Sequence, residues 1–366
     1  MLCAASAQRR SCFVVDRFRP GNFHCNRAAK LELKHSGHYH PPIRFVVPKR
    51  NFGTRCKAMK LFVTGICGRL GRAIAAEAEA QGHTVVGLDK VPWPAAKAPL
   101  PEGVKVIEGS YEEIPTMERH LSGCDAIAHT AGPHGEYVEK LDLSGFLRSN
   151  VESVARMLEL ASRLGVRRVA LSSTMEILIG RNWTASGAAV VDEESTPVCD
   201  SAYSISRLLQ EQLAKEFSRT HGVSIGSLRY MAFGYEADKD LGPHLLARSL
   251  TPSDVARAVL RVASMDDLRG DVFNIGPKTP LTNEDIIAAK TNPEAVVERY
   301  FPGAFAVLKA NGYKLIWDDF WPVTSIRKAK LILGWEPQYT FETWLGERGW
   351  KRKYSTPLGS TIGICR

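Results

Sequence analysis

The chain has 366 residues, of which 44% are hydrophobic and 24% charged, a composition typical of a globular protein and not of a disordered or low-complexity one. Its formal net charge of +9 is unevenly spread, because residues 1–58 carry a net charge of +10 and the rest of the chain sums to about −1. A nearly neutral body argues against nucleic acid as a partner, since nucleic-acid-binding domains carry a basic surface.

Residues 1–58 form a basic leader with twelve Lys/Arg and only two acids, Asp16 and Glu32. The leader lacks an apolar run long enough for a signal peptide or a transmembrane helix, and we expect no membrane partner. We interpret it as an organellar transit peptide or a disordered extension, with Met59 as the alternative start. The predicted location is therefore a plastid or mitochondrion if the leader is real, and the cytoplasm otherwise.

The eight cysteines divide evenly between the leader and the body, and none shows a C-x-x-C or C-x-x-H spacing. Zinc sites require such clusters of ligands, so we expect no metal. Cys67, Cys124, Cys199 and Cys365 of the body are predicted to be reduced thiols.

From Lys60 onward, short apolar runs alternate with longer segments of helical pattern. Near-continuous apolar strands separated by helices indicate a parallel sheet that is covered on both faces. We therefore predict an α/β fold with a doubly wound, Rossmann-like parallel sheet. The predicted strands are KLFVT (60–64), HTVVGLD (83–89), VKVIEG (104–109), DAIAHTAG (125–132), VRRVALSST (166–174), VSIGSLRY (223–230) and GDVFNIG (270–276). The predicted helices follow the first strand to about residue 80 and then cover 147–164, 201–219 and 252–264.

Beyond residue 279 the pattern loosens into an α-rich C-terminal section with several aromatic residues. These rings either pack a small lobe or line a substrate pocket, and packing is the more frequent role of such residues. They are Tyr300, Phe301, Trp317, Phe320 and Trp321.

The stretch KLFVTGICGRLGR places Gly65, Gly68 and Gly71 between the first strand and the first helix, with Arg69 and Leu70 inside the turn. Glycines at this spacing let the backbone approach a pyrophosphate, whose charge then lies on the helix N-terminus. The motif therefore predicts a dinucleotide-binding site.

An acidic residue, Asp89, follows at the end of the second strand, where an acceptor for the ribose 2′-hydroxyl is expected. A carboxylate there favours NAD, because it would repel the 2′-phosphate of NADP. Lys90 and Arg69 are nearby cations that weaken this preference, so NADP stays the alternative cofactor.

The chain resembles the extended short-chain dehydrogenase/reductases, and most of all their NAD-dependent epimerase/dehydratase branch. The resemblance covers roughly residues 59–345. It rests on TGICGRLG (64–71), HTAG (129–132), SST (172–174), Tyr203 in the following helix, LRYMAFGY (228–235), VFNIGP (272–277) and KAKLILGWEPQYTFE (328–342). It implies that residues 59–250 are an NAD(P)-binding domain with the catalytic residues, followed by core elements and a substrate lobe over 251–345 and a basic tail over 346–366. It also implies cofactor contacts from Thr130, Ala131, Gly132 and Asn150.

The same resemblance assigns the catalytic base to Tyr203 and the hydroxyl that binds the reacting oxygen to Thr174, with Ser173 as the fallback. An unperturbed phenol titrates near pH 10 and needs a neighbouring cation to act as a base at neutral pH. Arg207, four residues after Tyr203 and on the same helix face, is placed to be that cation and to contact the cofactor.

The family has lysine at the position of Arg207. Arginine keeps the charge, and at an effective dielectric of about 20 its attraction for a phenolate about 4 Å away is about 4 kcal/mol. Arginine does not release its proton, so a proton relay through this residue is not expected. We therefore predict a working but altered acid/base pair.

The substrate contacts are harder to assign. Dehydratases of this branch carry an aspartate–glutamate pair after the threonine, and here the first acid is replaced by methionine, which leaves Glu176. Only about fifteen residues separate residue 235 from the helix that begins near 251, so a clamp for a whole nucleoside diphosphate is not expected. His134 and Arg229 are candidates to orient a polar or anionic substrate.

Three functions fit these observations. The first is an NAD(P)-dependent oxidoreductase that acts on a small sugar-like or hydroxy/keto compound. The second is a nucleotide-sugar epimerase that retains NAD through turnover. The third is a non-catalytic dinucleotide-binding or RNA-associated organellar protein, which the departure at Arg207 and the basic leader favour. The resemblance also implies a homodimer formed through the two long helices, 147–164 and 201–219.

Overall fold

The computed structural model describes residues 58–180, 190–234, 238–313, 315 and 322–352. Contacts divide the chain into two units, Met1–Pro48 and Lys49–Arg366, and all described residues belong to the second. Almost all of the predicted leader, and the tail from residue 353, lie outside the described residues, so the transit peptide stays a prediction.

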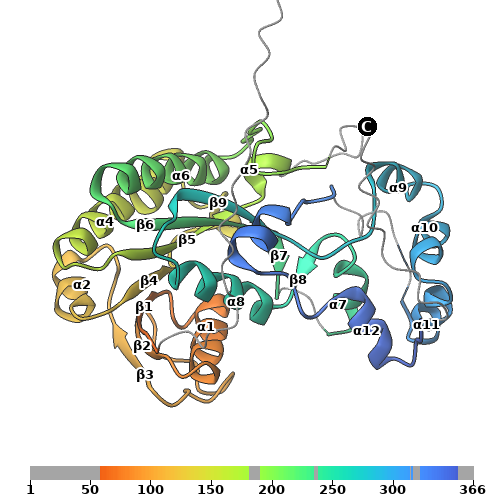
Figure 1. Ribbon diagram of the computed structural model, residues 1–366, viewed down its shortest axis with the longest axis horizontal. Coiled ribbons are helices and arrows are strands. Elements are labelled where there is room, and N and C mark those ends of the chain that lie inside the picture. Colours follow the sequence, from red (N-terminus) through yellow and green to blue (C-terminus); the bar gives the residue numbers. More distant parts are fainter. Residues whose placement is uncertain (1–57, 181–189, 235–237, 314, 316–321, 353–366) are drawn as a thin grey trace, which may run out of the picture. The chain divides into compact units, whose positions relative to one another are not determined.

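Seven parallel strands form the central sheet in the order β3-β2-β1-β4-β5-β6-β9 (Figure 1). Every pairing in this sheet is parallel, and the order reverses between β1 and β4. This is the predicted doubly wound, Rossmann-like α/β fold, which is confirmed. The strands are β1 (Lys60–Thr64), β2 (Thr84–Asp89), β3 (Val104–Glu108), β4 (Ala126–His129), β5 (Arg168–Thr174), β6 (Ser224–Tyr230) and β9 (Arg269–Ile275).

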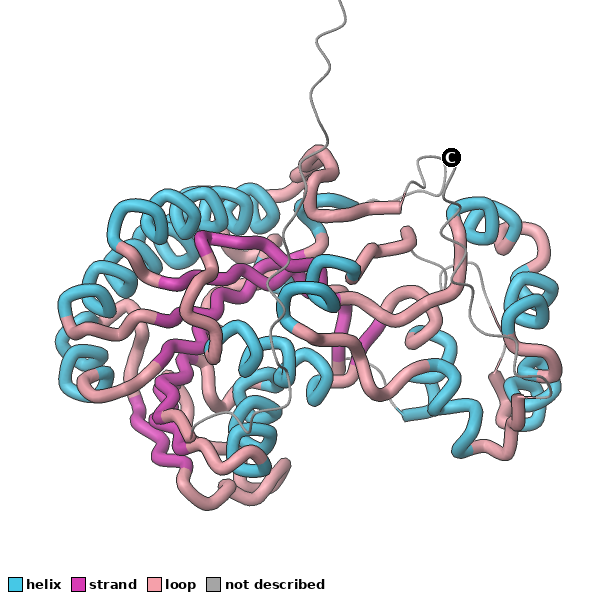
Figure 2. Tube along the Cα trace, in the orientation of Figure 1, coloured by secondary structure: helices cyan, strands magenta, loops and turns pink. Residues whose placement is uncertain are grey.

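Helices cover both faces of the sheet, as Figure 2 shows. Strand β1 shows why both faces need a cover, because its side chains point alternately into two buried clusters. Leu61 and Val63 pack with α1 (Arg69–Ala80) and α8 (Pro252–Ala263). Phe62 packs on the other side, in a cluster that includes residues of α2 (Ile114–Leu121), α4 (Ser153–Arg163) and α6 (Ala202–His221).

The predicted helix over 147–164 consists of three consecutive segments. It comprises α3 (Leu143–Leu147), a π-helical turn η2 (Arg148–Glu152) and α4. The wide turn contains Asn150, whose buried amide donates to Ser206 Oγ at 3.0 Å. The π-helical turn therefore contacts α6 through a polar hydrogen bond. Hydrophobic periodicity in the sequence could not predict such a contact.

Short elements surround the carboxyl ends of the strands. They are η1 (Gly135–Tyr137), α5 (Glu176–Ile179), α7 (Asp238–His244) and a separate two-stranded sheet of β7 (Ala232–Phe233) and β8 (Ser249–Leu250). Most of the fifteen-residue stretch after residue 235 is thus one short helix and one short strand.

The α-rich C-terminal section has a core of its own, to which Leu245 and Leu246 also contribute. Phe301 is buried there and Tyr300 packs against it, which resolves their role in favour of packing. Trp317, Phe320 and Trp321 lie outside the described residues. The section contains α9 (Asn283–Ala288), α10 (Pro293–Tyr300), α11 (Ala304–Ala310), a π-helical turn η5 (Ala329–Leu333) and α12 (Phe341–Glu347).

The described residues contain neither a membrane-spanning helix nor a cluster of metal ligands. None of their helices combines the length and the apolar content needed to cross a membrane. The same residues hold no group of three or more His, Cys, Asp or Glu side chains placed to bind a metal ion.

Candidate active site

Two glycines of the turn between β1 and α1 lie in close contact with neighbouring backbone. Gly65 has a φ of +73°, and a Cβ there would come within 2.9 Å of the Ala131 nitrogen. A Cβ on Gly71 would come within 2.2 Å of the Gly65 oxygen. Helix α1 begins after Gly68 with no side-chain cap and no acid in its first turn. Its positive end is therefore left for an anion, and the turn fits the pyrophosphate of a dinucleotide.

Asp89 lies beside this turn at the end of β2. Its carboxylate accepts a hydrogen bond from the Cys67 backbone N–H at 2.8 Å and another from Val91 at 3.3 Å. The position suits an acceptor for a ribose hydroxyl. The same carboxylate, after burial, helps raise the pKa of the Cys67 thiol to about 11, so this cysteine is an unreactive thiol at neutral pH.

A cavity of about 600 Å³ lies at the carboxyl ends of the strands, beside the point where the strand order reverses. It extends from the glycine turn past β4 and β5 to the end of β6. The cavity brings together most of the residues that the sequence singled out. These are Gly65, Gly68, Arg69, Leu70, Gly71, Thr130, Gly132, His134, Ser173, Thr174, Glu176, Tyr203 and Arg207.

Tyr203 projects into the cavity from the first turn of α6. A capping box fixes where this helix starts, because Ser204 N–H donates to Ser201 Oγ at 3.1 Å and Ser201 N–H donates to Ser204 Oγ at 3.2 Å. The Tyr203 ring packs against Phe146, with centroids 5.9 Å apart. Within the described residues nothing hydrogen-bonds the phenol group, which is left for a ligand.

Arg207 lies one turn further along α6, with its guanidinium carbon 5.5 Å from the centroid of the Tyr203 ring. A cation over an aromatic face at this distance is attracted to the ring. Arg207 is 3% exposed, and its guanidinium donates to the Ser172 carbonyl at 3.1 Å and to the Pro133 carbonyl at 3.4 Å. The arginine therefore connects α6, β5 and the loop after β4.

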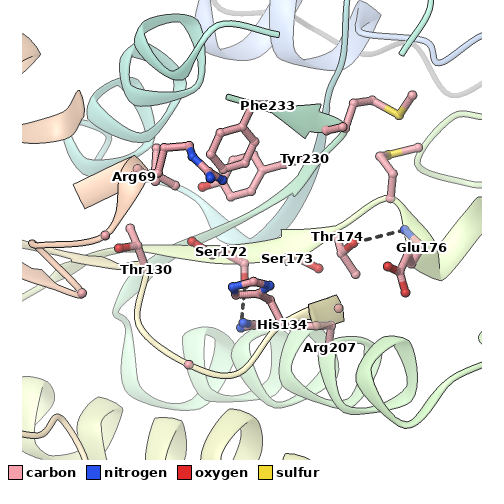
Figure 3. A pocket seen from close by; sticks show the side chains of 18 of the residues that line it. Arg69, Thr130, His134, Ser172, Ser173, Thr174, Glu176, Arg207, Tyr230 and Phe233 are labelled. Atoms are coloured by element: carbon pink, nitrogen blue, oxygen red, sulfur yellow. Dashed lines mark hydrogen bonds between the residues drawn. The ribbon is translucent and has the colours of Figure 1, made fainter. Parts of the chain in front are cut away.

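The two hydroxyls at the end of β5 have different surroundings. Thr174 Oγ1 accepts from the Glu176 N–H at 3.2 Å, which leaves its own O–H to donate to a substrate oxygen (Figure 3). Ser173 Oγ instead donates to Glu211 Oε1 at 2.5 Å. Of the pair, Ser173 is thus the hydroxyl whose proton is committed to a carboxylate of the protein.

Several buried groups around Arg207 are held neutral. Burial, reinforced by the positive charge of Arg207, lowers the pKa of His129 to about 3. Burial and the nearby Glu112 raise the pKa of Tyr111 to about 12, and burial raises the pKa of Tyr230 as well. These three groups add no competing charge at neutral pH.

The cavity is also lined by His134, from the loop after β4, and by Glu176, from α5. Figure 3 shows Thr174 and Glu176 on one side and Arg69, Tyr230 and Phe233 on the other. A carboxylate, an imidazole and hydroxyls can exchange hydrogen bonds with a polyhydroxy compound.

The expected substrate contact by Arg229 is wrong. Its side chain is 5% exposed and forms a bidentate ion pair with Glu211, at 3.0 Å and 2.7 Å, and it does not line the cavity. Successive residues of a strand face opposite sides of the sheet, and here the next residue, Tyr230, is the one that reaches the cavity. The prediction therefore assigned Arg229 to the wrong face of β6.

Four expected cofactor contacts also lie off the cavity, and one of them is Asp89, described above. Asn150 is fully buried, and its amide donates to Ser206 Oγ and, at 3.3 Å, to the Pro133 carbonyl, so it supports the loop. Ala131 packs against the core beneath α2 and α4. Lys90 is exposed and pairs with Glu112 at 3.4 Å. Together with Glu108 and Glu113 it lines a separate recess, whose acidic character, added to that of Asp89, disfavours a 2′-phosphate.

Sequence reasoning missed other residues that line the cavity. Tyr230 and Phe233 lie within the LRYMAFGY stretch that supported the resemblance, so the motif contained a signal for them. Lys97 lies in the irregular loop between β2 and β3 and has no such signal.

The NAD-dependent epimerase/dehydratase family model matches residues 61–251, about half of the chain. The chain belongs to this family. The predictions of an extended short-chain dehydrogenase/reductase enzyme and of NAD as its cofactor are therefore confirmed.

Relatives of this family match most of the chain at low identity. A UDP-glucuronate 4-epimerase of Thermodesulfobacterium geofontis is 23% identical over 313 residues, covering 76% of this chain and 92% of that protein. A UDP-glucose 4-epimerase of Corynebacterium glutamicum is 23% identical over 338 residues, covering 82% and 97%. Among solved structures, a UDP-N-acetylglucosamine 4-epimerase from Bacillus cereus superposes with a TM-score of 0.58 at 20% identity, covering 80% of this chain and 98% of that one. The last similarity concerns the fold alone.

Proposed function

We propose that this protein is an NAD-dependent oxidoreductase that interconverts a hydroxyl and a carbonyl on a small sugar-like or hydroxy/keto compound. The observation that supports this most is the gathering of Tyr203, Thr174 and Arg207 around one cavity that also contains the glycine turn. The segment between β7 and β8 is short, and its described residues contain one helix, α7, which supports a small substrate.

The residues of the cavity have complementary roles in this proposal. Gly65, Gly68 and Gly71 would hold the pyrophosphate of the cofactor, and Asp89 its adenosine ribose. NAD, when bound, supplies or takes up the hydride. Tyr203 would remove the proton of the substrate hydroxyl during oxidation and return it during reduction.

Thr174 and Arg207 assist Tyr203 in different ways. The Thr174 hydroxyl would donate to the reacting oxygen and hold it beside the phenol. The guanidinium of Arg207 favours the phenolate by its charge. Arg229 is bound to Glu211, and His134 and Glu176 are among the polar groups that line the cavity and suit the hydroxyl groups of a substrate.

A nucleotide-sugar epimerase that retains NAD is the second candidate. It is favoured because the UDP-sugar epimerases described above align over at least nine tenths of their own length. The two candidates differ in a simple way, since an epimerase purifies with bound NAD and shows no net production of NADH.

A spectrophotometric screen tests the proposal. Free sugars, uronates and hydroxy-ketones are supplied with NAD or NADH, and NADH absorbance is followed. We expect turnover with at least one of them, and a loss of about 10²-fold or more in kcat for Tyr203→Phe with NADH binding retained. Net turnover that Tyr203→Phe leaves intact would remove Tyr203 from the mechanism. NADH binding without any turnover would favour the epimerase.

We also propose that the protein is a homodimer that pairs α4 and α6 of one copy with those of a second. The support is the family resemblance together with an exposed leucine, Leu209, on α6.

A further inference from the structure

Two buried arginines contact helix α6, and they differ in how their charge is balanced. Arg229 is neutralised by Glu211, with 2.7 Å between Nη2 and Oε2. Arg207 is equally buried, yet no carboxylate in the described part of the chain forms an ion pair with it. Its hydrogen bonds end on neutral oxygens, namely two backbone carbonyls and the side-chain amide of Gln210. A buried charge without a counter-ion is unusual, and here the charge faces the Tyr203 ring.

Gln210 has no exposed surface, and both polar atoms of its side chain take part in this arrangement. Its Oε1 accepts from Arg207 Nη1 at 2.7 Å, and its Nε2 donates to the Ser172 carbonyl at 3.0 Å. The same carbonyl accepts from Arg207 Nη1 at 3.1 Å, so the three groups close a ring of hydrogen bonds. Nη1 has two hydrogens and the ring offers it two acceptors. A planar guanidinium is thereby fixed relative to both α6 and β5.

We propose that Gln210 is a positioning residue, which holds the Arg207 guanidinium beside Tyr203 and, because it is neutral, leaves the positive charge available to the phenolate. This inference rests on the proposed function, since it concerns the acid/base pair. It explains how arginine can occupy a position where the family has lysine. A glutamate at 210 would bind the guanidinium as well, but would cancel the charge that the phenolate needs.

Other charged and titratable groups surround the pair. His129 on β4, Tyr111 after β3 and Tyr230 on β6 are neutral at working pH for the reasons given above. On α6 itself, Glu211 is paired with Arg229. The other charged and titratable groups that line the cavity are His134, Glu176, Arg69, Arg72 and Lys97, and all of them are the same in the proteins compared below.

The test compares Gln210→Glu and Gln210→Met in the full-length protein. Gln210→Glu keeps the shape and an acceptor but adds a negative charge. We expect it to move the acidic limb of the pH–rate profile upward by about one unit. Gln210→Met removes the acceptor, and we expect kcat to fall about tenfold with KM within about twofold, the size of a hydrogen bond to a charged group. The matched control is Gln212→Met, which makes the same change at an exposed position of α6.

Repeating Gln210→Met in a protein that also carries Arg207→Lys tests whether Gln210 positions Arg207 or only stabilises the fold. With Arg207→Lys, the side chain at 207 no longer has a planar guanidinium for the ring to orient, so adding Gln210→Met should cost under about twofold. Equal losses from Gln210→Met in the arginine and lysine backgrounds would overturn the proposal. A pH–rate profile of Gln210→Glu that coincides with that of the unchanged protein would also overturn the proposal. This second test remains valid even if the Gln210→Met variant fails to fold.

A readout without turnover keeps this inference separate from the proposed function. Ultraviolet difference titration, with the matching Tyr203→Phe protein subtracted, follows ionisation of this one phenol. We expect a higher midpoint in Gln210→Glu and no change in Gln212→Met. If no substrate is ever found, this shift still supports the role of Gln210. If turnover is found and the midpoint does not move, the role of Gln210 is refuted while the proposed function stands.

Discussion

His129 is an imidazole at the end of β4, sealed beneath the cavity. It is fully buried, its Nδ1 lies 2.8 Å from the Thr64 hydroxyl, and its Nε2 has no hydrogen-bond partner among the described residues. Protonation would add a second buried positive charge close to Arg207. Keeping the imidazole neutral therefore avoids repulsion between two buried positive charges. The native state should lose stability at a pH low enough to protonate histidine in the unfolded chain.

This cost can be measured. The pKa of His129 falls from 6.5 to about 3 on folding, so between these pH values the unfolded chain binds a proton at this residue and the native state does not. Stability is complete above about pH 6.5 and declines as the pH falls toward 3, by about 1.4 kcal/mol per pH unit from this residue. Urea unfolding at several pH values between about 6 and 4 should therefore give a shallower slope for His129→Asn than for the unchanged protein. Identical slopes would show that His129 is not held neutral.

Single side chains set the limit of what could be predicted from the sequence. Tyr203, Thr174 and Arg207 were found because they occur in a motif, and the structure places all three on one cavity. Arg229 was misassigned because a motif gives the strand but not which face a residue occupies. Gln210 carries no signal at all, since its role depends on where a carbonyl of β5 lies relative to α6.

At the scale of elements, the turn that joins β1 to α1 combines several constraints at once. Gly65 needs a positive φ, Gly71 lies against the backbone of the preceding turn, and the start of α1 lacks a cap of its own. A side chain at Gly71 meets backbone atoms, which cannot move aside as a flexible side chain would.

We therefore expect Gly71→Ala to damage the cofactor site more than the fold. The added methyl must displace the Gly65 carbonyl, at a cost of about 1–3 kcal/mol, and NADH affinity should fall at least tenfold. Gly346→Ala is the control, because this exposed glycine of α12 has no atom near the added methyl and should gain about 0.5–1 kcal/mol from its helix. Thermal melts and NADH fluorescence titrations of both variants check this. Unchanged NADH affinity in Gly71→Ala would place the pyrophosphate elsewhere.

Elements were predictable where local chemistry defines them. The glycine turn, the alternation of strands and helices, and the start of α6 at Ser201 could all be located in the sequence, the last because Ser201 and Ser204 cap each other. The π-helical turn at Asn150 could not, because its cause is a hydrogen bond to Ser206 on another helix. The same holds for β7 and β8, two-residue strands that pair only because the chain returns beside itself.

At the scale of the whole molecule, the proposed oxidoreductase activity and the proposed homodimer depend on different surfaces. The cavity lies at the carboxyl ends of the strands, whereas α4 and α6 cover one face of the sheet (Figure 1). Association through these helices can therefore be disrupted without touching the cavity directly. Leu209 suits this purpose, since 43% of its surface is exposed on α6 and it lies two residues, or about 200° around the helix, beyond the buried Arg207.

Leu209→Glu should convert the protein from a dimer to a monomer, because in a dimer built on α6 it buries a charge in an apolar contact. Light scattering of the full-length protein should give twice the 40.4 kDa chain mass before the substitution and the single mass after it. Leu331→Glu makes the same change at a 47% exposed leucine of η5 and should leave the dimer intact. NADH affinity should stay within about twofold in both variants, since neither residue lines the cavity. A monomeric unchanged protein, or dimers that survive Leu209→Glu but not Leu331→Glu, would assign the interface to another face.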